Sequence, residues 1–133
     1  MALNKDRETP RRDGRRLVIG VAAATEIFGG GMVAVDGSGN ALPAADSAGL
    51  KVAGIAEEHV DNSDGVAGEK EMLVERGRAY KLANSAANPV TAAHLLTDVY
   101  VEDDETVAAT GGTNSIVAGR CIAVDSDGVW VEI

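Results

Sequence analysis

The chain of 133 residues carries 12 basic and 21 acidic side chains, a net charge of −9, and only 3% aromatic residues. This length fits one domain, the acidity disfavours contact with a nucleic-acid backbone, and one cysteine excludes an intramolecular disulfide. No apolar run is long enough to span a bilayer and no signal peptide is recognised, so we expect a soluble protein made in the cytoplasm.

Charge is distributed unevenly along the chain. Residues 1–16 carry six basic and three acidic side chains, a net charge of +3, whereas residues 17–133 carry −12. This first segment has almost no apolar residue after Leu3 and contains Pro10 and Gly14, so we expect an extended arm without its own fold. This arm is either a solvated, frayed terminus or a docking arm for an acidic partner surface. The candidate partner-binding side chains are those of Arg11, Arg12, Arg15 and Arg16.

After the arm, short apolar runs with alternating character, separated by glycine- and aspartate-containing turns, predict strands. We expect strands at residues 16–21, 32–35, 52–57, 69–74, 78–82, 98–101, 106–109, 117–122 and 129–133. Residues 36–40 predict a hairpin turn, and Asp-Gly at residues 127–128 predicts the closing hairpin. Residues 42–49 and 58–68 read as loops, and residues 89–96 are the best candidate for a short helix.

One stretch occurs twice. Val52-Ala53-Gly54 returns as Val117-Ala118-Gly119, and the valine-rich strand at residues 33–35 returns at residues 99–101. A glycine inside a strand marks a bulge, a bend or the close approach of another backbone. We therefore predict a mainly β domain, a compact barrel or sandwich with an internal pseudo-repeat. The alternative is a chance similarity between two generic β-patterns.

Residues capable of chemistry lack the spacing that chemistry needs. The three glycines at residues 29–31 are followed by a strand and by no lysine-serine/threonine pair, so they do not predict a phosphate loop. His59, Asp61 and Asp64 supply only half of a metal site and favour a solvated loop. Cys121 lies in an apolar strand and is expected to be buried. We assign no catalytic, cofactor or metal residue and expect no enzyme.

Several short motifs follow Leu17 in a characteristic order: Gly30-Gly31-Met32-Val33, Val52-Ala53-Gly54-Ile55-Ala56, Gly68-Glu69, Val74-Glu75-Arg76-Gly77, Tyr80-Lys81-Leu82, Val90-Thr91-Ala92, Val99-Tyr100-Val101, Val117-Ala118-Gly119 and Val129-Trp130-Val131. This order resembles the capsid cement, or decoration, proteins of tailed bacteriophages. The resemblance implies a compact β-rich domain that assembles, often as trimers, outside the expanded head and bridges major capsid subunits without a cofactor. Ala92-Ala93-His94-Leu95 departs from the glycine-acid turn common in that family.

The expectation is therefore a structural virion protein, with an arm at residues 1–16 and a single β-rich domain at residues 17–133. Its partners would be the major capsid protein and further copies of itself, as a trimer, on the outer surface of the capsid; neither nucleic acid nor membrane is a partner. The alternative is a stand-alone β-barrel that binds a small molecule or sugar, which would need a suitably lined cavity. A third hypothesis is a small hydrolase that uses the loop acids.

Overall fold

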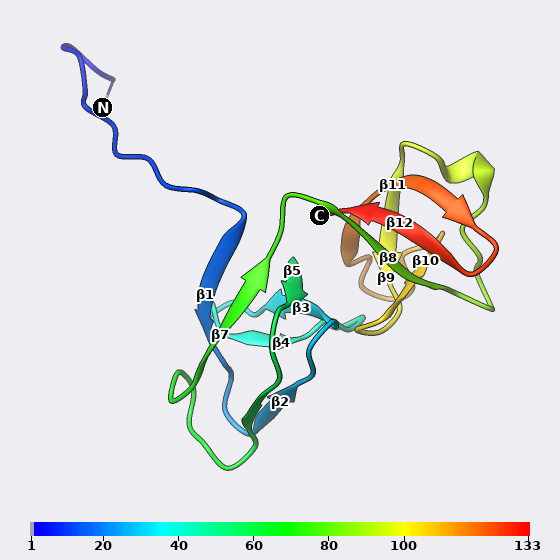
Figure 1. Ribbon diagram of the computed structural model, residues 1–133, viewed down its shortest axis with the longest axis horizontal. Helices are drawn as coiled ribbons and strands as arrows, with labels where there is room; N and C mark the ends of the chain where they lie inside the picture. The colour runs from blue at the N-terminus through cyan, green and yellow to red at the C-terminus, as the bar shows by residue number, and fades with distance from the viewer. Residues whose placement is uncertain (1) are drawn as a thin grey trace.

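The computed structural model describes residues 2–133 (Figure 1). It is 43% strand and 2% helix, which confirms the predicted mainly β fold. The one helical element among the described residues is a 3-10 turn, η1 (Ala92–His94), inside the segment expected to be helical. The strands are β1 (Arg16–Gly20), β2 (Thr25–Ile27), β3 (Met32–Val35), β4 (Ala41–Pro43), β5 (Lys51–Ala56), β6 (Val60–Asn62), β7 (Glu71–Glu75), β8 (Ala79–Asn84), β9 (Asp98–Val101), β10 (Thr106–Ala108), β11 (Val117–Asp125) and β12 (Gly128–Glu132).

Ten of these strands form two five-stranded units with the same order. The first runs β1-β7-β5-β3-β4, and a parallel bridge from Val21 to Ala41 brings its two edges together. The second runs β8-β12-β11-β9-β10 and is closed into a barrel by parallel pairing of β8 with β10. We call them the first and second barrels; Figure 1 shows them as separate lobes.

The two barrels correspond residue by residue at the repeated motif. Each copy has a bulge at its alanine, Ala53 in β5 and Ala118 in β11. The cross-strand pairs that flank each bulge also correspond: Val33 with Gly54 and Ala34 with Val52 in the first barrel, Val99 with Gly119 and Tyr100 with Val117 in the second. The predicted pseudo-repeat is therefore a duplication of one barrel.

The repeated glycine is required by close packing of backbones. A Cβ atom at Gly54 would overlap the carbonyl oxygen of Glu75 in β7, and one at Gly119 would overlap that of Glu132 in β12. Each glycine thus lets the next strand cross directly over the bulged strand, as expected for close backbone approach.

A left-handed turn is also repeated. The Gly30 N–H donates to the Ala56 carbonyl and the Leu96 N–H donates to the Cys121 carbonyl, each at 2.8 Å. Both residues have positive φ, 86° for Gly30 and 61° for Leu96. This conformation suits glycine but costs a residue with a Cβ roughly 1–2 kcal/mol. The second barrel keeps the turn with a leucine in a strained position.

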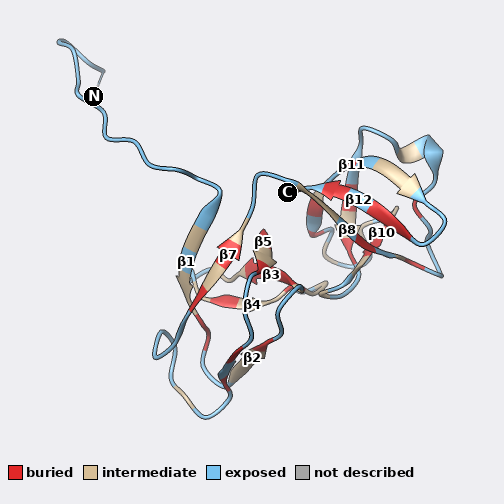
Figure 2. Ribbon diagram, viewed as in Figure 1, coloured by how far each residue is buried: buried red, intermediate tan, exposed pale blue. Residues whose placement is uncertain are grey.

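The outer face of the first barrel packs onto the core of the second. Met32 of β3 is fully buried in the second barrel's core cluster, and Ile55 of β5 packs against that cluster. The corresponding residues of the second barrel are Asp98 and Arg120, a cross-strand pair on an exposed face. The same position is therefore apolar where the other barrel covers it and charged where it faces solvent. Figure 2 shows buried segments in both lobes and exposed residues along the N-terminal arm.

Polar contacts add to this junction. The Asp46 carboxylate accepts backbone N–H bonds from Thr113 (2.9 Å) and Asn114 (2.8 Å). These bonds stabilise the ionised carboxylate, so the pKa of Asp46 is lowered. Where the barrels follow one another in the chain, the Gly77 N–H donates to the Ile133 carbonyl at 2.8 Å. Contacts at both ends of the junction hold the two barrels together.

Two segments expected to be loops contain strands. Residues 42–49 overlap β4, and residues 58–68 contain β6, which pairs with β2 in a two-stranded ribbon beside the first barrel. We call β2, β6 and the residues between β5 and β7 the ribbon. Its sequence is polar because only one of its sides is buried. There the Asn62 amide nitrogen donates to the carbonyls of Val21, Ala22 and Val66.

We predict that Gly54→Ala and Gly119→Ala each lower the free energy of unfolding by about 1–3 kcal/mol, because the added methyl group overlaps a backbone carbonyl. Denaturant unfolding measures the effect. Gly37→Ala is the matched control, since nothing lies within 4 Å of its Cβ position and its φ is not positive. Unchanged midpoints for both test variants would contradict the proposed role of the glycines.

We also predict that Leu96→Gly raises the free energy of unfolding, by up to about 1 kcal/mol. The change removes the positive-φ strain, which exceeds the entropic cost of glycine, and Leu96 is largely exposed, so little burial is lost. The reverse change, Gly30→Leu, should destabilise. A loss of stability in Leu96→Gly would show that the leucine contributes packing that outweighs its backbone strain.

Candidate partner-binding site

The N-terminal arm extends away from both barrels (Figure 1). Residues 2–16 are all exposed, and β1 begins at Arg16, so the last residue assigned to the arm already belongs to the sheet. One backbone bond joins residues 2–15 to the rest of the described chain, from the Arg76 N–H to the Arg15 carbonyl at 2.7 Å. The arm is thus anchored at its end and presents its length to solvent.

The four candidate arginines divide into two pairs. Arg15 binds Asp13, with Nη2 to Oδ2 at 2.9 Å, and Arg16 Nε lies 3.4 Å from the Glu57 carboxylate. The Arg15 hydrogen bonds lower the pKa of Asp13 to about 2. Arg11 and Arg12 make no hydrogen bond or ion pair with any residue in 2–133. The sequence could not separate these pairs, because the acid that faces Arg16 is distant in the chain.

A small hollow of about 120 Å³ lies at the base of the arm. Its lining residues carry charges of both signs: Asp13, Arg15, Arg16, Glu75 and Arg78. The Tyr80 hydroxyl beside it donates to Glu75 Oε1 at 3.1 Å. Burial, and then this bond to a carboxylate, raise the pKa of Tyr80 to about 12. Because its charges compensate one another, the hollow fixes the start of β1 and offers little net charge to a partner.

A second candidate surface was not expected from the sequence. Phe28, at the end of β2, is 57% exposed, and its ring stacks on that of His59 with centroids 4.9 Å apart and planes at 10°. His59 Nε2 lies 2.8 Å from Glu26 Oε2, which holds the stacked pair in place. The signal available in the sequence was a single phenylalanine directly before three glycines.

An open hollow of about 420 Å³ adjoins this ring. Its lining comes from both barrels: Phe28, Gly29, Gly30, Gly31, Asp104 and Glu105. Asp104 is fixed there because its carbonyl accepts the Met32 N–H at 2.6 Å. The site therefore combines an exposed aromatic ring with two carboxylates.

Of the half metal site considered above, Asp61 and Asp64 line one open hollow of about 280 Å³, and His59 is not part of its lining. His59 faces Glu26, while Asp61 accepts the Ser63 N–H at 3.0 Å, and bonds from Ser63 lower its pKa. Within residues 2–133 no group of three or more His, Cys, Asp or Glu side chains is placed to hold a metal ion.

Two further side chains that are capable of chemistry or hydrogen bonding are buried. Cys121 is fully buried, as predicted, and burial raises the pKa of its thiol. Asn62 is 1% exposed, and its Oδ1 has no hydrogen-bond partner among the described residues. A Cβ atom at Gly65 would overlap both that oxygen and a Glu69 carboxylate oxygen, so their close approach requires glycine there.

We predict that Tyr80 ionises near pH 12, which an absorbance titration of Tyr100→Phe would measure, since the chain has two tyrosines. The folded pKa lies above the unfolded value near 10. The stabilisation from neutral Tyr80 is therefore complete below pH 10 and is lost as pH rises from about 10 to 12. A midpoint near 10 in the folded protein would show that the Tyr80 hydroxyl is neither buried nor bonded to Glu75.

In the part of the chain that the structure describes, no helix is long and apolar enough to cross a membrane. Comparison of the chain with known proteins finds no matching family, no matching curated protein and no matching solved structure.

Proposed function

We propose that this chain is a cement protein of a tailed-bacteriophage capsid, which binds the outside of the expanded head and bridges major capsid subunits. The observation that carries the proposal is the arm, an exposed segment that leaves a well-packed body and presents Arg11 and Arg12 without partners among residues 2–133. The order of motifs that resembles the cement family supports the same function.

The energetics of the arm favour a role in assembly. Ordering an extended segment costs roughly 1–2 kcal/mol per residue in backbone entropy, and this arm buries too little apolar surface on its own body to offset that cost. Guanidinium–carboxylate pairs with a neighbouring subunit, either capsid protein or a second cement subunit, are strong enough to help offset this entropy cost. The arm therefore orders when the protein binds and acts as a tether.

The body suits a bridging role. Its charge of −12 over residues 17–133 keeps copies soluble before assembly. The packed face at Met32 and the hydrogen bonds accepted by Asp46 join the two barrels into one elongated unit. Such a unit can contact two neighbours at once. A filled interior argues against the alternative of a small-molecule barrel, since Cys121, Val129 and Val131 occupy the second barrel's core with no exposure.

The direct test mixes the purified protein with expanded, undecorated heads of the phage that encodes it. Electron microscopy of these heads should show regular added density outside the shell. Bare heads at saturating protein concentration would overturn the proposal.

We predict that replacing Arg11 and Arg12 together by serine weakens attachment to heads about tenfold or more, because charge-assisted hydrogen bonds are lost. The melting temperature should not change, since these side chains contact nothing in the body. The matched control is Lys51→Ser with Arg76→Ser, which removes two exposed charges from the barrels instead. Higher salt should weaken wild-type binding in part. Equal affinity of the arm variant and wild type would make the arm a passive tail.

A further inference from the structure

The first barrel contains a segment that the second barrel lacks. In the second barrel β11 joins β12 through residues 126–127, whereas in the first barrel β5 joins β7 through residues 57–70, which include β6 of the ribbon. The counterpart of Phe28 is His94, which shares its place in a repeated turn: their carbonyls accept the Gly31 and Thr97 N–H groups. His94 accepts the Thr91 N–H within η1 and presents no stacked ring. The ribbon and its exposed aromatic are additions to a barrel that closes without them.

The added surface has a definite chemistry. One face of the Phe28 ring is covered by His59, and the ring remains more than half exposed, so its other face is open. Two acidic residues, Asp104 and Glu105, line the hollow beside it. A guanidinium stacks on an aromatic face and donates N–H bonds to carboxylates in its plane. The hollow therefore has the groups that recognise an arginine side chain.

We propose that this hollow binds Arg11 or Arg12 from the arm of a second copy of the chain. This inference rests on the proposed function, in which the arm is a tether, and it names the site to which that tether binds. Within the described residues, Arg15, Arg16 and Arg78 already face carboxylates, whereas Arg11 and Arg12 do not. They also lie on an extended segment that can enter an open hollow.

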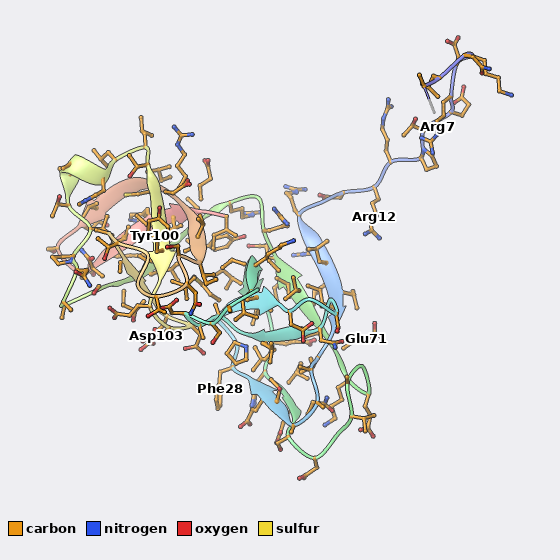
Figure 3. All side chains as sticks on the ribbon, turned by 180° about the vertical axis from the view of Figure 1, so that it is seen from behind. Arg7, Arg12, Phe28, Glu71, Tyr100 and Asp103 are labelled. Carbon is orange, nitrogen blue, oxygen red and sulfur yellow. The ribbon has the colours of Figure 1, made fainter. Side chains whose placement is uncertain are left out.

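The geometry favours a second copy over the same chain. Figure 3 shows Phe28 projecting from the body on a side remote from Arg12, and the arm leads further away from it. Donor and acceptor surfaces are thus different parts of the molecule. Such head-to-tail contacts form either closed rings or open chains. A ring of three would account for the trimer that the family resemblance implies.

The chain offers a built-in probe, because Phe28 is its only phenylalanine. Full-length protein grown with 4-fluorophenylalanine has one ¹⁹F resonance, located in the hollow. We expect this resonance to move as protein concentration rises. The Arg11→Ser, Arg12→Ser protein should stay at the dilute position, with association weakened about tenfold or more. Adding a peptide of residues 1–15 to that variant should restore the shift.

Two controls separate this contact from general effects. Lys51→Ser with Arg76→Ser should keep the concentration dependence. Light scattering should show a lower mass for Phe28→Ser at a concentration where wild type is oligomeric, but no change for Val66→Ser, which removes an apolar side chain that is 70% exposed elsewhere on the ribbon. Unfolding of Phe28→Ser would leave the resonance test intact, since that test uses the native ring.

Each other outcome overturns the inference. A ¹⁹F chemical shift that changes neither with protein concentration nor on addition of the peptide shows that the arm does not reach the hollow. A resonance that differs between wild type and the arm variant at every concentration shows docking within one chain. The proposed function fails separately, if heads remain bare in electron microscopy. A protein that decorates heads but whose Phe28 resonance does not shift refutes only the arm-docking site.

Discussion

The fold depends on one contact that occurs twice: a glycine backbone lies against the carbonyl of the following strand, at Gly54 with Glu75 and at Gly119 with Glu132. The bulge beside each glycine turns the strand sharply enough for five short strands to close on themselves. A chain with so few aromatic residues has mostly small side chains for its core. Such side chains fill a barrel only if its strands curve tightly. The chain builds this tightly curved barrel twice and packs the two copies together.

The two copies differ where they pack together. The apolar pair Met32 and Ile55 lies on the covered face of the first barrel, and the charged pair Asp98 and Arg120 lies at the equivalent, exposed face of the second. Repeat proteins use the same device when a terminal repeat needs a polar outer surface. Positions that are alike in both barrels therefore support the barrel fold. Positions that differ reflect whether the other barrel or solvent covers them.

Strand alternation and the repeated Val-Ala-Gly motif were enough to predict the fold class and the internal duplication, because both reflect local backbone rules. The ribbon could not be predicted, since β6 is three residues long and one of its two buried residues, Asn62, is polar. Sequence named all four arm arginines as equals; only the fold brings Glu57 to Arg16 and leaves Arg11 and Arg12 open. The Phe28 hollow draws on residues far apart in the chain, Phe28 and Asp104, so no local pattern could reveal it.

Two barrels with the same strand order in one chain create a hazard during folding, because β5 and β11 have the same bulge and could each enter the other's place. Exchange of similar elements is a characteristic failure of repeated folds. The Asp98–Arg120 pair discriminates between the two arrangements. A misplaced β11 would bring Arg120 against Met32 in the packed junction, and a misplaced β5 would leave Ile55 beside Asp98 in solvent. Burying an unpaired charge is costly, so the charged pair that keeps the outer face soluble also directs each strand to its own barrel.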